Sequence, residues 1–339
     1  MISYHQLVAS AVLLLVSPIR VFGQLLMPLD RSVEEDLFHR NLGNGSGTNM
    51  PLIVTVIDST TDLTELCYTF QTLVRAKAFP TASIMAFHGL HLSDELVDSL
   101  QSCTNRDATF VDITLFYNIF PEGFTPVPGV NYDKQQTERF FVTELWELPH
   151  VEAHDVIVRV TDTTCLTYDN YDLPDFSSNL PDGFTKNGLM YQTQTVPGFH
   201  VLPYKYTKNL FDITYNYMTA NNITPLNPVL WENIEKYHND FNSLPKWDNT
   251  FEIVRKEFML RRDVADYHHF ITNTHAGYFY NTNWSSEVLR YLTLSLFGAV
   301  DETFIKHVSG YMEKDFLKGK FYPGVCRLGP FGTPPPITS

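Results

Sequence analysis

The chain has 339 residues, of which 44% are hydrophobic and 18% charged, and its net charge is −14. This composition and length are typical of a folded protein with one large α/β domain or two modest ones, and they exclude a disordered chain. The acidic balance, without any cluster of Lys and Arg, argues against a nucleic-acid-binding protein and against attraction to an anionic membrane surface. A nucleotide-sugar would also be repelled, so a site for one must supply a cation.

The first 50 residues are predicted to be a targeting segment (1–23) followed by a stem or linker (24–50). An apolar run from Leu7 to Val16 precedes Val21-Phe22-Gly23. The small or short residues at the last and third-last positions, Gly23 and Val21, fit cleavage by signal peptidase. The alternative is an uncleaved signal anchor, although the run is short for a membrane span; Pro18 and Arg20 favour cleavage. Both alternatives place the remaining residues on the lumenal or extracellular side.

Sequons and cysteines agree with that compartment. Three sequons begin at Asn44, Asn222 and Asn283. The four cysteines either form two disulfides, in one of three connectivities, or remain buried thiols. None has the close spacing of a zinc site; they are Cys67, Cys103, Cys165 and Cys326.

Strands and helices are predicted to alternate through the first half of the body. The apolar runs are typical of buried strands; they are Leu52 to Ile57, Ala82 to Phe87, Ala108 to Ile113 and Val156 to Val160. Helices are expected between them, from Leu63 to Ala76, from the N-cap Ser93 to Leu100, and from Gln135 to Trp146. This order predicts a sheet covered on both faces, with ligands at the carboxyl ends of its strands.

From Leu202 onward the pattern is mainly helical. One helix face is predicted to carry Ile253, Leu260, Val264, Tyr267 and Ile271. A second helix is expected to begin at Ser285 or Ser286 and to end at Gly298. Residues 51–330 are therefore predicted to form a single domain, in which helices close over the edge of a nucleotide-binding sheet.

Two stretches resemble the fungal-type α-1,2-mannosyltransferases of glycosyltransferase family 15. Between Trp247 and Phe297 the matches are Trp247, Phe251, Glu252, Ile253, Tyr267, Phe270, Gly277, Phe279, Tyr280, Trp284 and Phe297. Between Tyr132 and Leu166 they are Arg139, Phe140, Pro149, Asp155, Arg159 and Val160. The resemblance covers roughly residues 52–323.

The resemblance implies a nucleotide-diphospho-sugar transferase fold of the GT-A type, in which helices flank a mixed sheet. It also implies a retaining hexosyltransferase that moves mannose from GDP-mannose to a mannose-bearing glycan of glycoproteins. The cofactor would be a divalent cation, Mn²⁺. The protein would be a Golgi or endoplasmic-reticulum glycoprotein, either secreted or a type II membrane protein held only by its N-terminal segment.

Glu252 is the candidate catalytic residue. In the resembled family the corresponding carboxylate lies beside the anomeric carbon, as nucleophile or as stabiliser of an oxocarbenium ion, which suits retention of configuration. Without the resemblance, Glu252 reads as an acid at a helix N-terminus, with Thr250 as its cap.

Arg159 and Asp162 are the candidate residues for the sugar nucleotide, and Asp162 and Glu313 for the metal. The family's Glu-Pro-Asp is replaced here by Thr161-Asp162-Thr163, and Glu313 occupies the place of its metal-binding histidine. Carboxylates are suitable ligands for Mn²⁺ or Mg²⁺. The alternative for Asp162 is a turn cap after the strand.

Other departures from the family's motifs support an alternative function for the chain. Both acids of the family's Glu-Arg-Trp-Gly-Asp motif are absent, with Glu287 nearby as a possible substitute. The alternative function is therefore a catalytically inactive, lumenal or secreted protein of this fold that binds glycans. The histidines His268, His269 and His275 lack metalloprotease spacing and are expected to be structural.

Overall fold

The computed structural model describes residues 51–75, 79–166, 190–194, 201–247, 249–282, 284–307 and 311–313. These residues all belong to one compact unit, Asn49–Ser339. The predicted targeting segment and stem, the sequon residues Asn44 and Asn283, and Cys326 lie outside them. No helix within these ranges is long and apolar enough to span a membrane.

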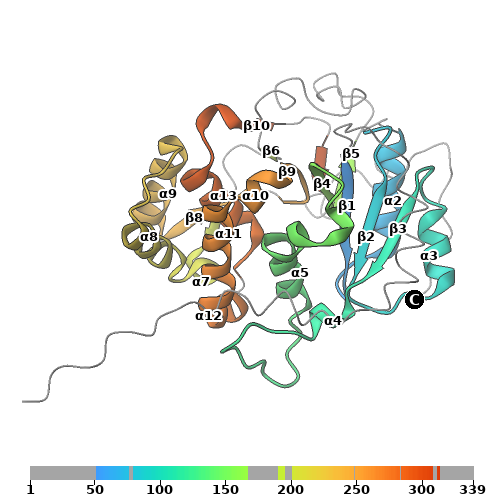
Figure 1. Ribbon diagram of the computed structural model, residues 1–339, viewed down its shortest axis with the longest axis horizontal. Coiled ribbons are helices and arrows are strands. Elements are labelled where there is room, and N and C mark those ends of the chain that lie inside the picture. Colours follow the sequence, from blue (N-terminus) through green and yellow to red (C-terminus); the bar gives the residue numbers. More distant parts are fainter. Residues whose placement is uncertain are drawn as a thin grey trace, which may run out of the picture. The chain divides into compact units, whose positions relative to one another are not determined.

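A seven-stranded mixed sheet forms the centre of the unit, in the order β10-β6-β9-β4-β1-β2-β3 (Figure 1). Strands β4, β1, β2 and β3 are parallel, and β9 lies antiparallel between β4 and β6. The strands of this sheet are β1 (Leu52–Ile57), β2 (Ile84–His88), β3 (Ala108–Asp112), β4 (Val156–Val160), β6 (Met190–Gln194), β9 (Phe251–Arg255) and β10 (Thr303–His307).

Two small antiparallel pairs accompany this sheet. One joins β5 (Thr164–Leu166) to β11 (Tyr311–Glu313), and the other joins β7 (Val201–Pro203) to β8 (Ser243–Pro245). The first pair continues directly from the carboxyl end of β4, where the sequence predicts the ligand site.

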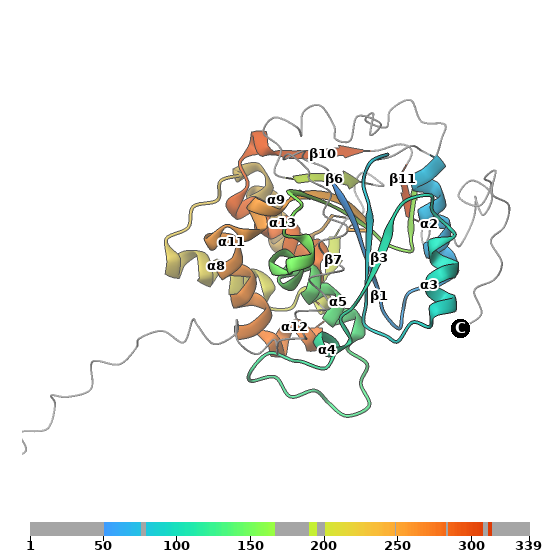
Figure 2. The same cartoon turned by 45° about the vertical axis from the view of Figure 1, so that its right-hand side comes forward.

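Helices flank the sheet, as Figure 2 shows. Those of the first half are α2 (Leu63–Arg75), α3 (Asp94–Gln101), α4 (Thr114–Tyr117) and α5 (Asp133–Val142). Those of the second half are α7 (Tyr204–Thr207), α8 (Leu210–Asn221), α9 (Pro228–Phe241), α10 (Lys256–Leu260), α11 (Arg262–His269), α12 (Ala276–Thr282) and α13 (Ser286–Phe297). Short 3-10 helices span Glu144–Glu147, Pro149–Val151 and Val300–Glu302, and a short π-helix spans Phe270–Thr274.

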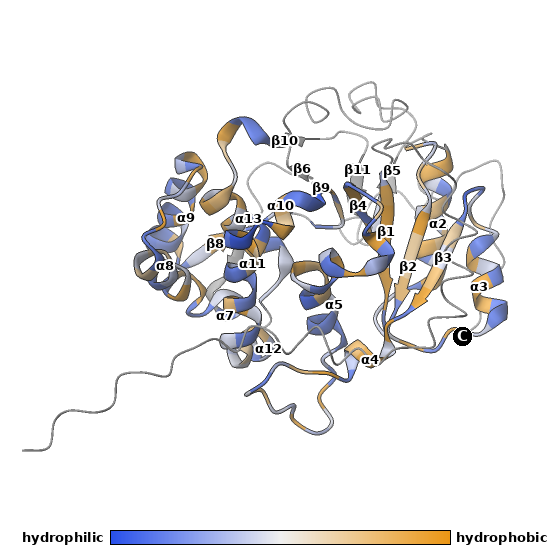
Figure 3. Cartoon of the chain, viewed as in Figure 1, coloured by the Kyte–Doolittle hydropathy of each residue, from blue (hydrophilic) through white to orange (hydrophobic). Residues whose placement is uncertain are grey.

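Alternating side chains of the central strands enter two separate cores. Leu52, Val54 and Val56 of β1 pack with α5 and α13, whereas Ile53 and Ile57 pack with α2 and α3. Both faces of a parallel strand are thus apolar, which explains the continuous hydrophobic run in the sequence and the colour of β1 and β2 in Figure 3. The predicted mixed sheet flanked by helices is confirmed.

The predicted helix from Ile253 onward is wrong at its start. Ile253 belongs to strand β9, and Phe251 and Ile253 face one core while Val254 faces the other, which is the two-residue period of a strand. Helix α10 begins at Lys256, the chain bends at Arg261, and Leu260 is 42% exposed. Glu252 is therefore not an acid at a helix start.

The predicted helix from Gln135 to Trp146 is also shorter than expected. Helix α5 ends at Val142, and a 3-10 turn covers Glu144–Glu147. By contrast, Ser93 caps α3 by accepting a hydrogen bond from the N–H of Leu96, as the sequence predicts.

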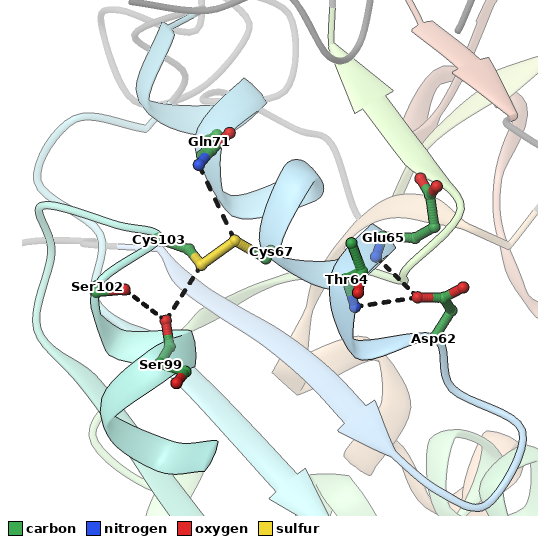
Figure 4. The surroundings of a disulfide bond; sticks show 8 residues. All are labelled: Asp62, Thr64, Glu65, Cys67, Gln71, Ser99, Ser102 and Cys103. Carbon is green, nitrogen blue, oxygen red and sulfur yellow. Dashed lines mark hydrogen bonds between the residues drawn. A yellow bond between two sulfur atoms is a disulfide. The ribbon is translucent and has the colours of Figure 1, made fainter. Parts of the chain in front are cut away.

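A disulfide joins Cys67 of α2 to Cys103, just after α3 (Figure 4). Both cysteines are buried in the core between these helices and the sheet. This bond is compatible with one of the three connectivities that the sequence allows.

Candidate active site

The turn that carries Asp162 lies at the carboxyl end of β4, against the start of α2. Asp162 Oδ2 accepts a hydrogen bond of 2.8 Å from the backbone N–H of Asp62. The Asp62 carboxylate in turn caps α2, since its Oδ1 accepts the N–H groups of Thr64 and Glu65 at 3.0 Å each. Two carboxylates therefore meet at the positive end of a helix dipole, and Asp62 is one that sequence reasoning missed.

Side-chain hydroxyls hold this turn in place. Thr69 of α2 donates to the carbonyl of Thr164 at 2.7 Å, and the N–H of Thr161 donates to Thr164 Oγ1 at 2.9 Å. Thr164 Oγ1 itself donates to the carbonyl of Thr250, which directly precedes β9. The Asp162 turn is thus linked both to α2 and to the strand that carries Glu252.

The backbone brings Glu313 beside the Asp162 turn. Strands β11 and β5 pair so that Glu313 lies opposite Thr164, two residues after Asp162. The two predicted metal ligands therefore share one end of the sheet, although the Glu313 side chain lies outside the described atoms. Among the side chains that are described, no three His, Cys, Asp or Glu groups converge on one point.

Glu252 lies on β9, directly opposite Arg159 of β4, and only 1% of it is exposed. Both carboxylate oxygens contact Arg290 of α13: Nε donates to Oε2 at 3.2 Å and Nη2 to Oε1 at 3.3 Å. Arg159 Nη1 is farther away, at 3.8 Å from Oε1. Glu252 is thus a buried carboxylate paired with two guanidinium groups.

Arg159 is enclosed by protein groups. Its Nη1 donates to Ser286 Oγ at 2.9 Å, and its guanidinium lies 3.7 Å from the centre of the Phe141 ring. Burial lowers the pKa of Arg159, and the negative charges of Glu252 and Glu138 oppose that shift. Arg159 Nε has no hydrogen-bond partner among the described groups. A role of Arg159 in phosphate binding stays a prediction.

Ser286, at the start of α13, connects these charges to α5. Its backbone N–H donates to Glu138 Oε2 at 2.8 Å, and its hydroxyl accepts from Asn249 Nδ2 at 2.6 Å. Glu287, the predicted substitute acid, instead forms a 2.8 Å ion pair with Lys246. The buried network holds two acids, Glu252 and Glu138, and two bases, Arg159 and Arg290, so its formal charges cancel.

Sequence reasoning missed Arg290 and Glu138. A signal was present for Arg290, because it is the sole Lys or Arg in a twelve-residue helix whose other side chains are mostly apolar. A buried charge requires a partner, so Arg290 could have been expected to contact an acid.

Glu252 and the Asp162 turn lie at the same end of the sheet. Glu252 pairs with Arg159, and Asp162 follows three residues later, which corresponds to at most about 10 Å along the strand direction. The backbones of Arg159, Asp162, Glu252 and Glu313 therefore lie at one end of the sheet, and the roles of these residues stay predictions.

The loop after β1 lies at the same end of the sheet, because β1 runs parallel to β4. Asp58 is buried and accepts hydrogen bonds from Thr60, from its N–H at 2.8 Å and from its hydroxyl at 2.6 Å. It also accepts from the hydroxyl of Thr137, and Ser59 donates to Asp133, so two contacts tie the loop to α5. Asp58 was not singled out in the sequence.

Among the described residues, His268, His269 and His275 belong to no group of three or more potential metal ligands. His268 is buried on α11 and its Nε2 lies 2.7 Å from Thr293 Oγ1. Burial, with the nearby charges of Arg290 and His269, holds the pKa of His268 well below its usual range. Its surroundings indicate a neutral structural residue, as the sequence predicts.

Comparisons with known proteins extend these observations. No protein-family model and no curated protein matches the sequence. Among solved structures, core-mannan synthase A from Aspergillus fumigatus, in a Mn/GDP form, has a TM-score of 0.62 at 16% identity over 78% of this chain and 74% of that one. The mannosyltransferase Ktr4p from S. cerevisiae has a TM-score of 0.61 at 15% identity over 76% and 68%.

A second structure of Ktr4p, in complex with GDP, gives a TM-score of 0.61 at 15% identity over 78% of this chain and 71% of that one. These matches include most of both chains, and what the chains share is their architecture. The resemblance to the family 15 mannosyltransferases is confirmed for the fold, and this chain has the mixed-sheet architecture of the GT-A type.

Proposed function

We propose that the chain is a glycosyltransferase that moves mannose, with retention, from GDP-mannose to a mannose-bearing glycan of glycoproteins. The observation that carries this proposal is that Glu252 and the Asp162 turn lie at the same sheet edge, in a fold shared with two fungal mannosyltransferases. The Mn/GDP form and the GDP complex of those neighbours support a guanosine-diphosphate donor.

In this proposal Asp162 and Glu313 would hold the divalent cation. Their carboxylate oxygens are the ligands that Mn²⁺ accepts, and the pairing of Glu313 with Thr164 keeps the two residues close in the backbone. The chemistry of these two residue types supports their assignment as metal ligands. When bound, such a cation neutralises charge on the diphosphate leaving group.

Glu252 then supplies the negative charge beside the anomeric carbon. A carboxylate there stabilises the oxocarbenium-like transition state, or attacks the anomeric carbon and displaces GDP to give a covalent mannosyl-enzyme of inverted configuration. In the second case the acceptor hydroxyl, as it loses its proton, displaces the carboxylate, and this second inversion restores the original configuration. The ion pairs with Arg159 and Arg290 place two positive charges beside this buried acid.

The compartment is also a proposal. The predicted signal segment directs the chain to the secretory pathway, and the Cys67–Cys103 disulfide supports an oxidising lumen. Attachment to a Golgi or endoplasmic-reticulum membrane would depend on whether the N-terminal segment remains uncleaved.

One observation favours a second candidate, a non-catalytic glycan-binding protein of the same fold. Glu252 is 1% exposed and its carboxylate is enclosed by two arginines, which is also how a purely structural acid is held. The altered Glu-Pro-Asp motif points in the same direction.

Nucleotide binding separates the two candidates. GDP with Mn²⁺ should raise the melting temperature, and more than UDP with Mn²⁺, because a ligand that binds only the native state stabilises it. Asp162→Asn should reduce that rise, whereas Asp94→Asn, which changes an exposed first-turn acid of α3, should leave it unchanged. Absence of a shift with any nucleoside diphosphate at millimolar ligand and metal would favour the non-catalytic protein.

A further inference from the structure

Arg290 occupies an unusual position for a cation. It lies in the middle of α13, only 2% of it is exposed, and its neighbours on the helix, Leu289 and Tyr291, are buried too. Removing a guanidinium from water costs several kcal/mol, so a residue in this place must be compensated by specific contacts.

The contacts of Arg290 form a fixed frame around Glu252. Beside the two hydrogen bonds to the carboxylate, Nη2 donates to the carbonyl of Phe141 at 3.3 Å, and Nη1 lies 3.1 Å from Met259 Sδ. The guanidinium also lies 5.6 Å from the centre of the Trp146 ring. Groups from three other segments thus hold the planar guanidinium of Arg290, whose nitrogens donate to both carboxylate oxygens of Glu252.

Arg159 does not duplicate this contact. Its closest approach to Glu252 is 3.8 Å, and its hydrogen bond is made to Ser286. The other acid of the network, Glu138, accepts a hydrogen bond from the N–H of Ser286. Two hydrogen bonds at the Glu252 carboxylate therefore come from Arg290, while Arg159 adds positive charge.

We propose that Arg290 is the positioning residue for Glu252. The strand register fixes the backbone of Glu252, but its carboxylate can rotate about the terminal side-chain bonds unless it is held from both oxygens. The two hydrogen bonds from the Arg290 guanidinium fix that orientation. The inference rests on the proposed glycosyl transfer, in which a small misplacement of the reacting carboxylate is costly.

The test uses Arg290→Lys and Arg290→Gln in the full-length protein, with GDP-mannose, Mn²⁺ and a mannose disaccharide. Lysine retains the charge but lacks the planar guanidinium, so kcat should fall about tenfold. Glutamine should lower kcat about a hundredfold, with KM for the donor changed less than about twofold. The melting-temperature shift with GDP and Mn²⁺ should match that of the wild type.

Arg139→Gln is the matched control. Arg139 is equally buried, and it donates to the carbonyl of Ile119 and to the hydroxyl of Tyr280 without any described contact to Glu252. This variant should lose stability while keeping kcat. Arg290→Lys retains the buried charge, so the test stands even where Arg290→Gln does not fold.

Each result decides a question. A wild type that does not transfer mannose contradicts the proposed function, and this inference with it. A wild type that transfers, together with an Arg290→Lys variant of unchanged kcat, overturns the positioning role alone. A loss that appears wholly in KM, or that Arg139→Gln reproduces, also overturns it.

Discussion

The carboxylate of Glu138 accepts a 2.8 Å hydrogen bond from the backbone N–H of Ser286, so an acid of α5 caps α13 from 148 residues away. The Ser285 side chain makes no capping hydrogen bond to this helix. Glu138 also lies near Arg159 and opposes the effect of burial on that residue's pKa. The helix and the buried charge network are thus joined through one side chain.

Glu138→Ala should therefore destabilise the protein by about 1–3 kcal/mol, because it leaves a buried N–H without a partner and removes one counter-charge. Glu138→Gln, which can still accept that hydrogen bond, should cost less. Urea unfolding measures both.

Glu144→Ala serves as the comparison for this acid. The Glu144 side chain is 40% exposed, in a 3.5 Å ion pair with Arg139, and its loss should cost no more than about 1 kcal/mol. Equal destabilisation by Glu138→Ala and Glu144→Ala would show that the cap contributes little.

Elements governed by local pattern were predicted well. Strands β1 and β4 were predicted to the residue, because each is a short run of mostly apolar residues whose side chains enter both cores. The cap of α3 by Ser93 is a contact over three residues, which a sequence can indicate.

Contacts between distant segments account for what was missed. The strand around Glu252 was taken for the start of a helix because Ile253 fits the helical spacing of Leu260 and the apolar residues after it. The arginines that contact Glu252 come from two other elements. The same-edge placement of Glu252 and Asp162 came from the resemblance. The pairs Glu252–Arg290 and Glu138–Ser286 have no local signature, since their partners are 38 and 148 residues apart.

The disulfide should contribute measurably to stability. It closes a loop between residues separated by 36 positions, for which chain entropy predicts about 3–4 kcal/mol. The double variant Cys67→Ser, Cys103→Ser should lower the urea midpoint accordingly when both proteins are unfolded without reductant. Equal midpoints would show that the bond does not constrain the unfolded chain.

Acid should destabilise the protein through His268. Its folded-state pKa lies well below the unfolded value of about 6.5, so below that pH the unfolded chain binds a proton that the folded protein excludes. The contribution of neutral His268 is thus complete above about pH 6.5 and falls by up to about 1.4 kcal/mol per unit as the pH decreases toward the folded-state pKa.

His268→Gln should flatten this dependence between pH 6.5 and 5, as unfolding at several pH values can measure. The exposed His91 offers a control, since His91→Gln should retain the wild-type slope. An unchanged slope in His268→Gln would assign the acid sensitivity to other groups.

Asn222 should carry a glycan when the chain is expressed in eukaryotic cells. It is exposed at the end of α8 in a left-handed conformation, and Thr224 is exposed as well, so an oligosaccharyltransferase can reach the sequon. Asn222→Gln should abolish one deglycosylation-sensitive increment in mass, whereas Asn221→Gln at the neighbouring exposed position should not. A product unaffected by deglycosylation would contradict the proposed secretory compartment.

Mannose transfer by variants of Glu252 tests the central claim most directly. The wild type, with GDP-mannose and Mn²⁺, should extend a mannose acceptor. Glu252→Gln removes the charge and should abolish transfer, while Glu252→Asp keeps the charge, retracts the carboxylate, and should lower kcat about a hundredfold. Both variants should retain the GDP-dependent melting shift. Transfer by Glu252→Gln at the wild-type rate would contradict the account and leave Glu252 as a structural counter-ion of Arg159 and Arg290.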